Sequence, residues 1–243
     1  MKEAVKLAFV AALEREVRPL LEVSSRFDVN ADGRARVAYR LRDAVLLCSG
    51  PGYRNASTAA KLVIEEFSPE MIVSIGFAGA LASDLKIGEV FIPRQVISER
   101  NGSRFTSARG KERMLTAEAV VGEERKYELF KRFHVQAVDM EAAAVAEIAA
   151  ARGCEFLAMK VISDELNSRV GFVGPFISAQ GFRTRAFLTH VAFRPWLWPA
   201  VGKLQRDTVR ASESLCRAVR VLTEQGIAAL EELCPQAELR YSH

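Results

Sequence analysis

The chain has 243 residues, 49% of them hydrophobic and 26% charged, which is enough to bury a large core in one α/β domain. It has no apolar run as long as a membrane-spanning helix, and the charged residues from Glu14 to Glu16 argue against a signal peptide, so we expect no integral membrane segment and a cytoplasmic location. The formal net charge is +4; because charge runs usually form solvated helix faces and no nucleic-acid module is recognisable, we expect no nucleic-acid partner.

The cysteines and histidines do not form a recognisable metal or redox motif. The three histidines are scattered, and the four cysteines are far apart in the sequence: Cys48, Cys154, Cys216 and Cys234. This spacing favours free thiols in a reducing compartment over a zinc knuckle or a redox pair. We therefore predict no metal site and no resident cofactor.

Apolar runs and turn signals alternate along the first third of the chain. In chain order they predict a strand over 5–11, a helix over 14–21, a hairpin of strands over 36–41 and 45–48, a helix capped by Asn55 and ended by Pro69, and a strand over 71–75. A glycine-containing turn, Gly76-Phe77-Ala78-Gly79, is expected to follow that strand.

The same alternation continues to Asp164, with a polar and mobile segment expected over 101–113. The predicted elements are strands at 89–93, 94–97 and 119–121, a helix over 123–133, a strand ending at Asp139, a helix over 141–152 and a strand over 156–162. A loop over 171–181 and helices over 182–193 and 197–225 complete the chain. This order predicts an α/β fold whose mixed sheet is flanked by helices. We predict a single domain over 1–243 with a helical C-terminal extension from about residue 176.

Two acids sit at predicted strand ends, where open α/β sheets bind ligands. Glu141 follows the strand that ends at Asp139, and Asp164 follows the strand over 156–162. Each acid alone has a simpler explanation, since Glu141 suits a helix N-terminus and Asp164 suits a turn cap. Together they predict cleavage of a sugar–base bond, in which one carboxylate holds the ribose hydroxyls and an acid in a partly dry pocket protonates the departing base.

Glycine-bearing turns after predicted strands offer backbone amides to a ligand. They are Gly50 to Gly52 and Gly76 to Gly79, with Ala11-Ala12 in the matching place after the first strand. The three spaced glycines of a dinucleotide fingerprint are absent after the first strand, which disfavours a nicotinamide enzyme.

Four segments together resemble the nucleoside phosphorylase superfamily, which includes purine nucleoside phosphorylases and methylthioadenosine/adenosylhomocysteine nucleosidases. They are Val10 to Val17, Ser49 to Ala56, Ile72 to Leu81 and Val138 to Asp164. The C-terminal third, with Arg194-Pro195, Trp196 and Trp198, is more similar to the phosphorylases associated with hopanoid lipid synthesis. The resemblance implies one domain around a twisted mixed sheet and a homo-oligomer.

The resemblance also implies roles for individual residues. Glu141 would hold the ribose, Asp164 would protonate the purine, and Glu16 matches the acid that activates water in the nucleosidases. The residues expected to contact substrate are Met140, Ser163, Val120, Val121, Phe77, Ala78 and Gly79. The residues expected to bind phosphate are Gly52, Arg54, Arg15 and Arg18.

The main functional prediction is phosphorolysis of a purine nucleoside, with adenine as the base and inorganic phosphate as co-substrate. Hydrolysis with Glu16 activating water is the alternative. A non-catalytic nucleoside-binding protein is a third hypothesis, because Phe77 replaces a polar residue of the family and would crowd the phosphate or the ribose. An apolar substituent on the nucleoside would predict an open groove near one of four aromatic residues: Phe172, Phe176, Trp196 or Trp198.

Overall fold

The computed structural model describes residues 5–31, 34–168, 171–178, 181–183, 186–187, 190 and 194–230. Its centre is a large sheet in the strand order β2-β3-β4-β1-β5-β10-β9-β7-β8, and β11 pairs with both β5 and β6. The strands are β1 (Leu7–Ala11), β2 (Ser25–Ala31), β3 (Arg34–Leu41), β4 (Ala44–Cys48), β5 (Met71–Ala80), β6 (Val90–Phe91), β7 (Pro93–Ser98), β8 (Arg104–Thr106), β9 (Glu112–Thr116), β10 (Ala137–Asp139) and β11 (Glu155–Asp164). A separate hairpin joins β12 (Ile177–Ser178) to β13 (Gly181–Phe182).

Strand directions within the large sheet are mixed. β1 runs parallel to β4 and β5, and β11 runs parallel to β5. β10 runs antiparallel to β5 and parallel to β9. The predicted α/β fold with a mixed sheet flanked by helices is therefore confirmed, whereas the proposed start of a C-terminal extension stays a prediction.

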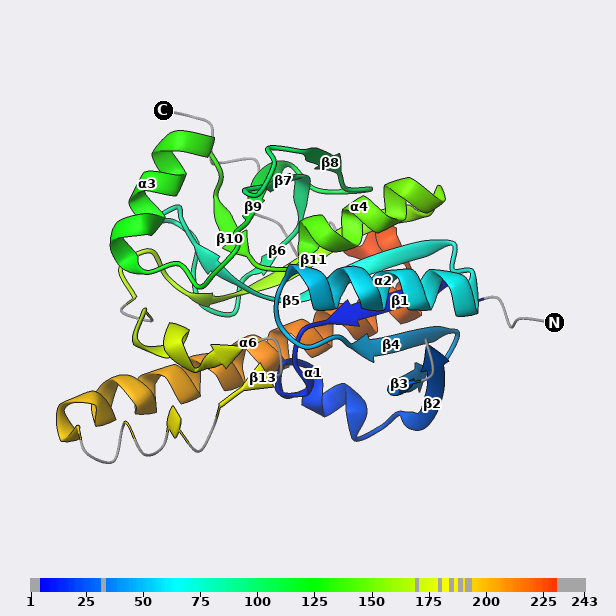
Figure 1. Ribbon diagram of the computed structural model, residues 1–243, viewed down its shortest axis with the longest axis horizontal. Helices are drawn as coiled ribbons and strands as arrows, with labels where there is room; N and C mark the ends of the chain where they lie inside the picture. Colours follow the sequence, from blue (N-terminus) through cyan, green and yellow to red (C-terminus); the bar gives the residue numbers. More distant parts are fainter. Residues whose placement is uncertain are drawn as a thin grey trace.

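Helices cover both faces of the sheet (Figure 1). They are α1 (Glu14–Leu21), α2 (Tyr53–Phe67), α3 (Glu123–Phe133), α4 (Ala142–Arg152) and α6 (Trp198–Gln225), with short 3-10 turns η1 (Gly171–Phe176), η2 (Pro195–Leu197) and η3 (Ile227–Ala229). α2 and α4 pack through alanines on one face, and α1 and α6 pack on the other.

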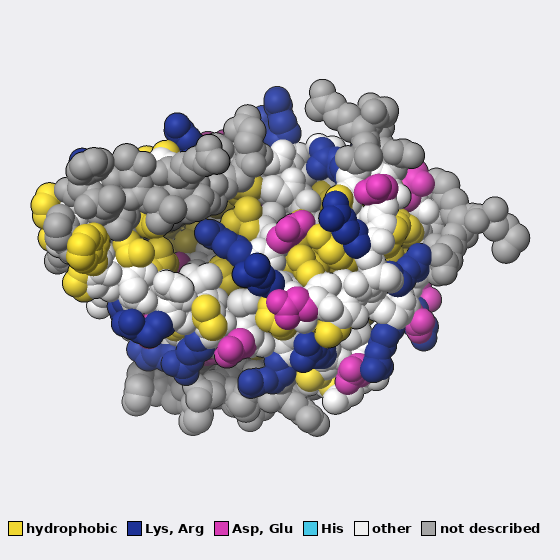
Figure 2. Space-filling model, turned by 90° about the horizontal axis from the view of Figure 1, so that it is seen from below, with side chains coloured by type: hydrophobic (Ala, Val, Ile, Leu, Met, Phe, Trp, Pro, Cys, Tyr) yellow, Lys and Arg dark blue, Asp and Glu magenta, His cyan; other side chains and the backbone are white. Residues whose placement is uncertain are grey.

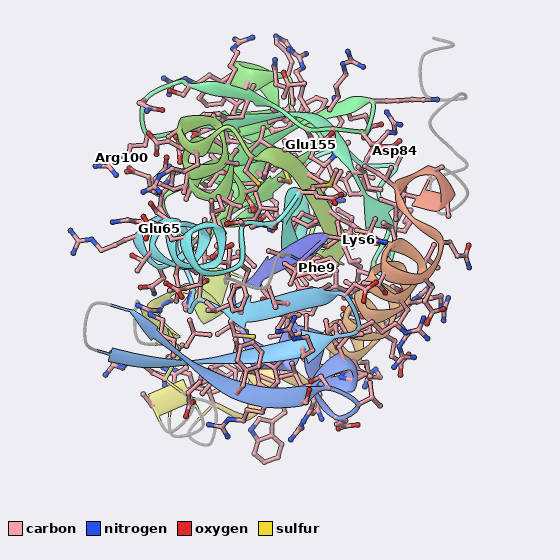
Figure 3. All side chains as sticks on the ribbon, turned by 90° about the vertical axis from the view of Figure 1, so that its right-hand side faces the viewer. Lys6, Phe9, Glu65, Asp84, Arg100 and Glu155 are labelled. Carbon is pink, nitrogen blue, oxygen red and sulfur yellow. The ribbon has the colours of Figure 1, made fainter. Side chains whose placement is uncertain are left out.

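Alternation along β1 shows how one strand serves both cores. Ala8 and Val10 belong to the core beneath α2 and α4, whereas Phe9 and Ala11 belong to the core beneath α1 and α6. This follows from the two-residue period of a strand, which points successive side chains to opposite faces. Phe9 lies in the interior of the molecule and Arg100 lies at its surface (Figure 3).

The largest departure from the sequence prediction is in β5. The Gly76-Phe77-Ala78-Gly79 segment, expected as a turn, continues the strand to Ala80. It stays extended because β11 pairs with it as far as Gly79 and β10 pairs with Gly79 and Ala80. Pairing with β11 along the segment, and with β10 from Gly79 onward, outweighs the usual weakness of glycine in a strand.

Other differences are local. The strand predicted over 119–121 is wrong, because these residues form the irregular connection between β9 and α3. The expected cap Asn55 lies inside α2, where its side-chain amide donates to the carbonyl of Pro51 at 3.0 Å, and Gly52 is the N-cap. β2 was not expected, and the polar segment 101–113 contains β8 and the start of β9. The helix predicted over 182–193 lies largely outside the described residues.

Candidate active site

A cavity of about 720 Å³ lies where β1, β5 and β11 end and where β10 passes into α4. Its lining includes three acids from distant parts of the chain: Glu16, Glu141 and Asp164. α6 closes one side with residues from Val201 to Glu213. The structure thus brings the two acids at the predicted strand ends into one space.

The strand register explains why these acids meet. Gly79 of β5 pairs with Asp164 of β11 on one side and with Val138 of β10 on the other. Glu141 follows two residues after the end of β10. The sequence places both acids at strand ends. Although β10 runs antiparallel to β5, their shared neighbour Gly79 brings them to one edge of the sheet.

Glu16 lies in the first turns of α1 and is buried. Its carboxylate sits over Gly76, where an added Cβ atom would come within 2.9 Å of Oε2 of Glu16. Oε2 also accepts a hydrogen bond from the backbone N–H of Leu13 at 3.4 Å. Burial, followed by the negative charge of Glu141, raises the pKa of Glu16 to about 7, against the lowering effect of Lys160.

Glu141 is held by backbone amides. The N–H of Gly52 donates to its Oε1 at 2.7 Å, and the N–H of Met140 donates to its Oε2 at 3.3 Å. Gly52 has φ +91°, which favours glycine at this position. Burial and the charge of Asp139 raise the pKa of Glu141 to about 6, while Lys160 and the two amides lower it.

Asp164 occupies the other end of the site. Its Oδ1 accepts a hydrogen bond from Oγ of Ser163 at 2.8 Å, and its Oδ2 accepts one from Nζ of Lys126 at 2.5 Å. Gly79 lies beneath the carboxylate, with room for no side chain, since an added Cβ would come within 2.9 Å of Oδ2. Ser163, which the sequence predicts to contact the substrate, is thus hydrogen-bonded to Asp164.

Two buried lysines and one aspartate of the site were missed in the sequence. Lys160 of β11, 1% exposed, forms an ion pair with Oδ2 of Asp139 at 3.0 Å and donates to Oγ of Ser74 at 3.0 Å. Asp139 also accepts hydrogen bonds from Thr116 Oγ1 at 2.7 Å and from the N–H of Ala142 at 2.8 Å. This network joins strands β5, β9, β10 and β11 to the start of α4 and places a positive charge near two acids.

The residues expected to contact sugar and base all line the cavity: Met140, Ser163, Val120, Val121, Phe77, Ala78 and Gly79. Val120 and Val121 do so from the connection before α3, not from the strand edge that we expected. Phe77 is part of the cavity wall and also packs against the core beneath α6, so it narrows the site without filling it.

The predicted phosphate ligands separate into two groups. Arg15 and Arg18 line the cavity, whereas Arg54 is exposed in the first turn of α2 and is not among the lining residues. The N–H of Gly52 already donates to Glu141. The geometry therefore does not favour Gly52 or Arg54 as a phosphate ligand, and the roles of Arg15 and Arg18 stay predictions.

An apolar wall extends the cavity along α6, through Val201, Leu204 and Val209. The two tryptophans expected to border an open groove do not line this cavity. Trp196 and Trp198 are 71% and 57% exposed and are not among the lining residues that the structure describes. Phe176 is buried against Phe187, and the side chain of Phe172 lies outside the described residues.

Three further features concern metal binding, membrane spans and the surface charge. Across the described residues, no group of three or more His, Cys, Asp or Glu side chains is arranged to hold a metal. Within that same part of the chain, no helix has the length and apolar character needed to cross a membrane. Basic and acidic side chains are interspersed on the face shown in Figure 2.

Comparisons with known proteins identify the family of this chain. The family described as the phosphorylase superfamily matches residues 6–119 and 113–189. The 5'-methylthioadenosine/S-adenosylhomocysteine nucleosidase of Anoxybacillus flavithermus is 28% identical over 153 residues, which cover 61% of this chain and 62% of that protein. The nucleosidase of the same name from Oceanobacillus iheyensis is 46% identical over 56 residues, or 23% of this chain and 24% of that protein. The matches to both relatives thus span less than two thirds of their length.

Solved structures share the fold over nearly the whole chain. The futalosine hydrolase of Helicobacter pylori superposes with a TM-score of 0.68 at 14% identity, covering 91% of this chain and 98% of that one. The 5'-methylthioadenosine/S-adenosylhomocysteine nucleosidase of Neisseria meningitidis, in complex with methylthio-immucillin-A, gives a TM-score of 0.68 at 20% identity and covers 93% and 100%.

Proposed function

Because the chain belongs to the phosphorylase superfamily, we propose that it is an enzyme that cleaves the N-glycosidic bond of a purine nucleoside, with water as the acceptor. The observation that carries this proposal is the meeting of Glu16, Glu141 and Asp164 in one cavity. The negative charge of Glu141 contributes to the raised pKa of Glu16, and the carboxylate of Asp164 lies over Gly79.

The raised pKa of Glu16 favours water over phosphate as the acceptor of the sugar. A general base works best when its pKa lies near the working pH, and the pKa of Glu16 is raised to about 7. A phosphate beside the ionised forms of Glu16 and Glu141 would meet like charge. Phosphorolysis, the main prediction from the sequence, loses two of its four predicted ligands in this geometry, and the curated relatives described above carry the name of nucleosidases.

The proposed reaction assigns one task to each acid. Glu141 binds the ribose hydroxyls and stabilises the positive charge that develops on the sugar as the bond to the base breaks. The electron pair of that bond moves to the purine, which takes up a proton at the Asp164 end of the cavity. Glu16 removes a proton from a water molecule as the oxygen of that water bonds to the ribose carbon. Met140 packs beneath the sugar.

The relatives and the cavity wall suggest which base and which sugar substituent the substrate carries. We propose adenine as the base, in line with the names of the nucleosidase relatives, and an apolar substituent on the far carbon of the sugar. The support for the substituent is the apolar wall that α6 adds through Val201, Leu204 and Val209. A role in hopanoid synthesis, a homo-oligomer and a cytoplasmic location stay predictions from the sequence.

Product analysis tests the proposal. Adenosine and 5'-methylthioadenosine are incubated with the enzyme, with and without inorganic phosphate, and the base and sugar products are separated. We expect adenine and a free sugar at rates that phosphate does not change. Base release that requires phosphate and yields a sugar 1-phosphate would restore the phosphorylase interpretation. Nucleoside binding by calorimetry without release of base would favour the non-catalytic hypothesis.

A further inference from the structure

Lys126 is a buried cation at the cavity wall that has no task in the reaction proposed above. It lies at the end of the first turn of α3, is 1% exposed and belongs to the cavity lining. Its ammonium donates to Oδ2 of Asp164 at 2.5 Å and to the carbonyl of Glu165 at 2.7 Å. These two bonds use two of its three N–H donors.

The hydrogen bonds around Asp164 raise a difficulty for it as the sole proton donor. Lys126 can only donate, so Oδ2 of Asp164 is an acceptor in this arrangement. Oδ1 accepts from the hydroxyl of Ser163. Asp164 therefore has the surroundings of a carboxylate, and a carboxylate has no proton to give to a departing base.

A purely structural role does not account well for Lys126. Removing an ammonium from water costs several kcal/mol, and a buried ion pair is often no more stabilising than apolar residues of similar volume. An apolar residue on α3 would anchor that helix without this cost, as Leu129 does three residues later. The charge is placed at the cavity wall, against the acid at the base end of the site.

We propose that Lys126 is the source of the proton that the departing purine acquires and that it acts through Asp164. As the glycosidic bond breaks, its electron pair makes the purine strongly basic. The Nζ–H bond of Lys126 breaks, its proton passes by way of Oδ2 of Asp164 to the purine, and a purine N–H bond forms. Lys126 is left as a neutral amine and regains a proton from water after the base leaves. This inference rests on the proposed function.

The decisive experiment compares purines that differ in their need for a proton. Wild type and Lys126→Met are assayed with adenosine, 2-fluoroadenosine and 6-chloropurine riboside, whose bases are increasingly acidic. We expect Lys126→Met to lose about 100-fold or more in kcat with adenosine and progressively less along the series, because a more acidic base leaves more readily without protonation. Lys131→Met, an exposed position on the same helix, is the matched control and should keep wild-type rates.

The role of Lys126 would be overturned by equal losses for all three nucleosides, which indicate a structural effect, or by no loss with adenosine. Lys126→Arg adds a second arm, because a guanidinium keeps the charge and the donors but does not release its proton. It should show the same dependence on the base, and full activity with adenosine would show that charge alone is needed. If the wild type releases no base from any nucleoside, the proposed function itself fails, which is a separate result.

Discussion

Gly79 lies directly beneath the carboxylate of Asp164, so close that a Cβ atom at position 79 would come within 2.9 Å of Oδ2. Gly76, three residues earlier in β5, lies in the same way beneath Oε2 of Glu16, also at 2.9 Å. One strand therefore supports two acids that are far apart in the sequence. The Gly76-Phe77-Ala78-Gly79 segment is best understood as the floor of the site, where a side chain at either glycine would displace a carboxylate.

Gly79→Ala should lower kcat about 100-fold while leaving the fold intact, because a misplacement of about 1 Å at a catalytic group costs that much. Gly79 has no unusual backbone angle, so the substitution acts through the contact with Asp164 alone. Gly122→Ala is the matched control, since a Cβ there meets no described atom within 4 Å. Steady-state rates of base release check the pair, and equal activity of the two variants would contradict this account of β5.

Asp164→Asn should lose most turnover, by about 10²- to 10⁴-fold, because an amide cannot pass a proton to the base. The variant should be less stable than wild type, because buried Lys126 loses its charged partner, but the fold should persist because the amide oxygen can still accept from Lys126. Asp43→Asn, in the exposed turn between β3 and β4, serves as the control. Circular dichroism and initial rates are sufficient, and near-normal rates in the Asp164 variant would remove this residue from the mechanism.

The activity should fall as the pH drops through about 7, because Glu16 must be ionised to accept a proton from water and its pKa is raised to about 7. Glu16→Gln should be slow at every pH and should lose this limb of the profile. A pH profile of kcat/KM for the two proteins makes the comparison. An acid limb that persists in Glu16→Gln would assign the titration to another group.

The same raised pKa has a consequence for stability. Folded Glu16 binds its proton more tightly than the unfolded chain does, so its contribution is favourable at low pH and is lost as the pH rises from about 4.5 to about 7. Glu16→Gln should therefore be more stable than wild type at pH 8, by up to about 3 kcal/mol, and similar to it near pH 4.5. Urea unfolding at the two pH values measures this, and a variant less stable at pH 8 would contradict the sign.

Asp139→Asn should destabilise the protein by about 3 kcal/mol or more, because it leaves Lys160 buried without its charged partner. The double variant Asp139→Asn/Lys160→Met should be less destabilised than the sum of the two single variants. Urea denaturation of the four proteins completes the cycle. Additive losses would mean that Asp139 and Lys160 do not interact in the folded protein.

The sequence was informative where the signal was local and periodic. Alternating apolar runs predict α1, α3 and α6 within about a residue of their ends, and they place Glu141 and Asp164 at or near the ends of strands. These local patterns are the reason that the fold class can be predicted from the sequence. Gly79 shows the limit, because a glycine that suggests a turn was held extended by β10 and β11, whose pairing is a tertiary effect.

The missing part of the site consists of ionic partners. Lys160 did leave a signal, since it is a lone charge in the middle of the apolar strand Glu155–Asp164, and such a residue must have a buried partner. Lys126 left none, because its helix carries several charged residues and only the folded chain shows which of them points inward. Partners of this kind depend on contacts between residues 38 and 21 positions apart, such as Lys126 with Asp164 and Lys160 with Asp139.

A crystal structure of the Asp164→Asn variant with bound adenosine is the sharpest test that the three acids share one substrate. We expect the nucleoside in this cavity, with the ribose hydroxyls within hydrogen-bond distance of Glu141, the imidazole edge of the base at position 164 and a water molecule between Glu16 and the sugar. A nucleoside bound elsewhere, or one whose ribose turns away from Glu141, would contradict it.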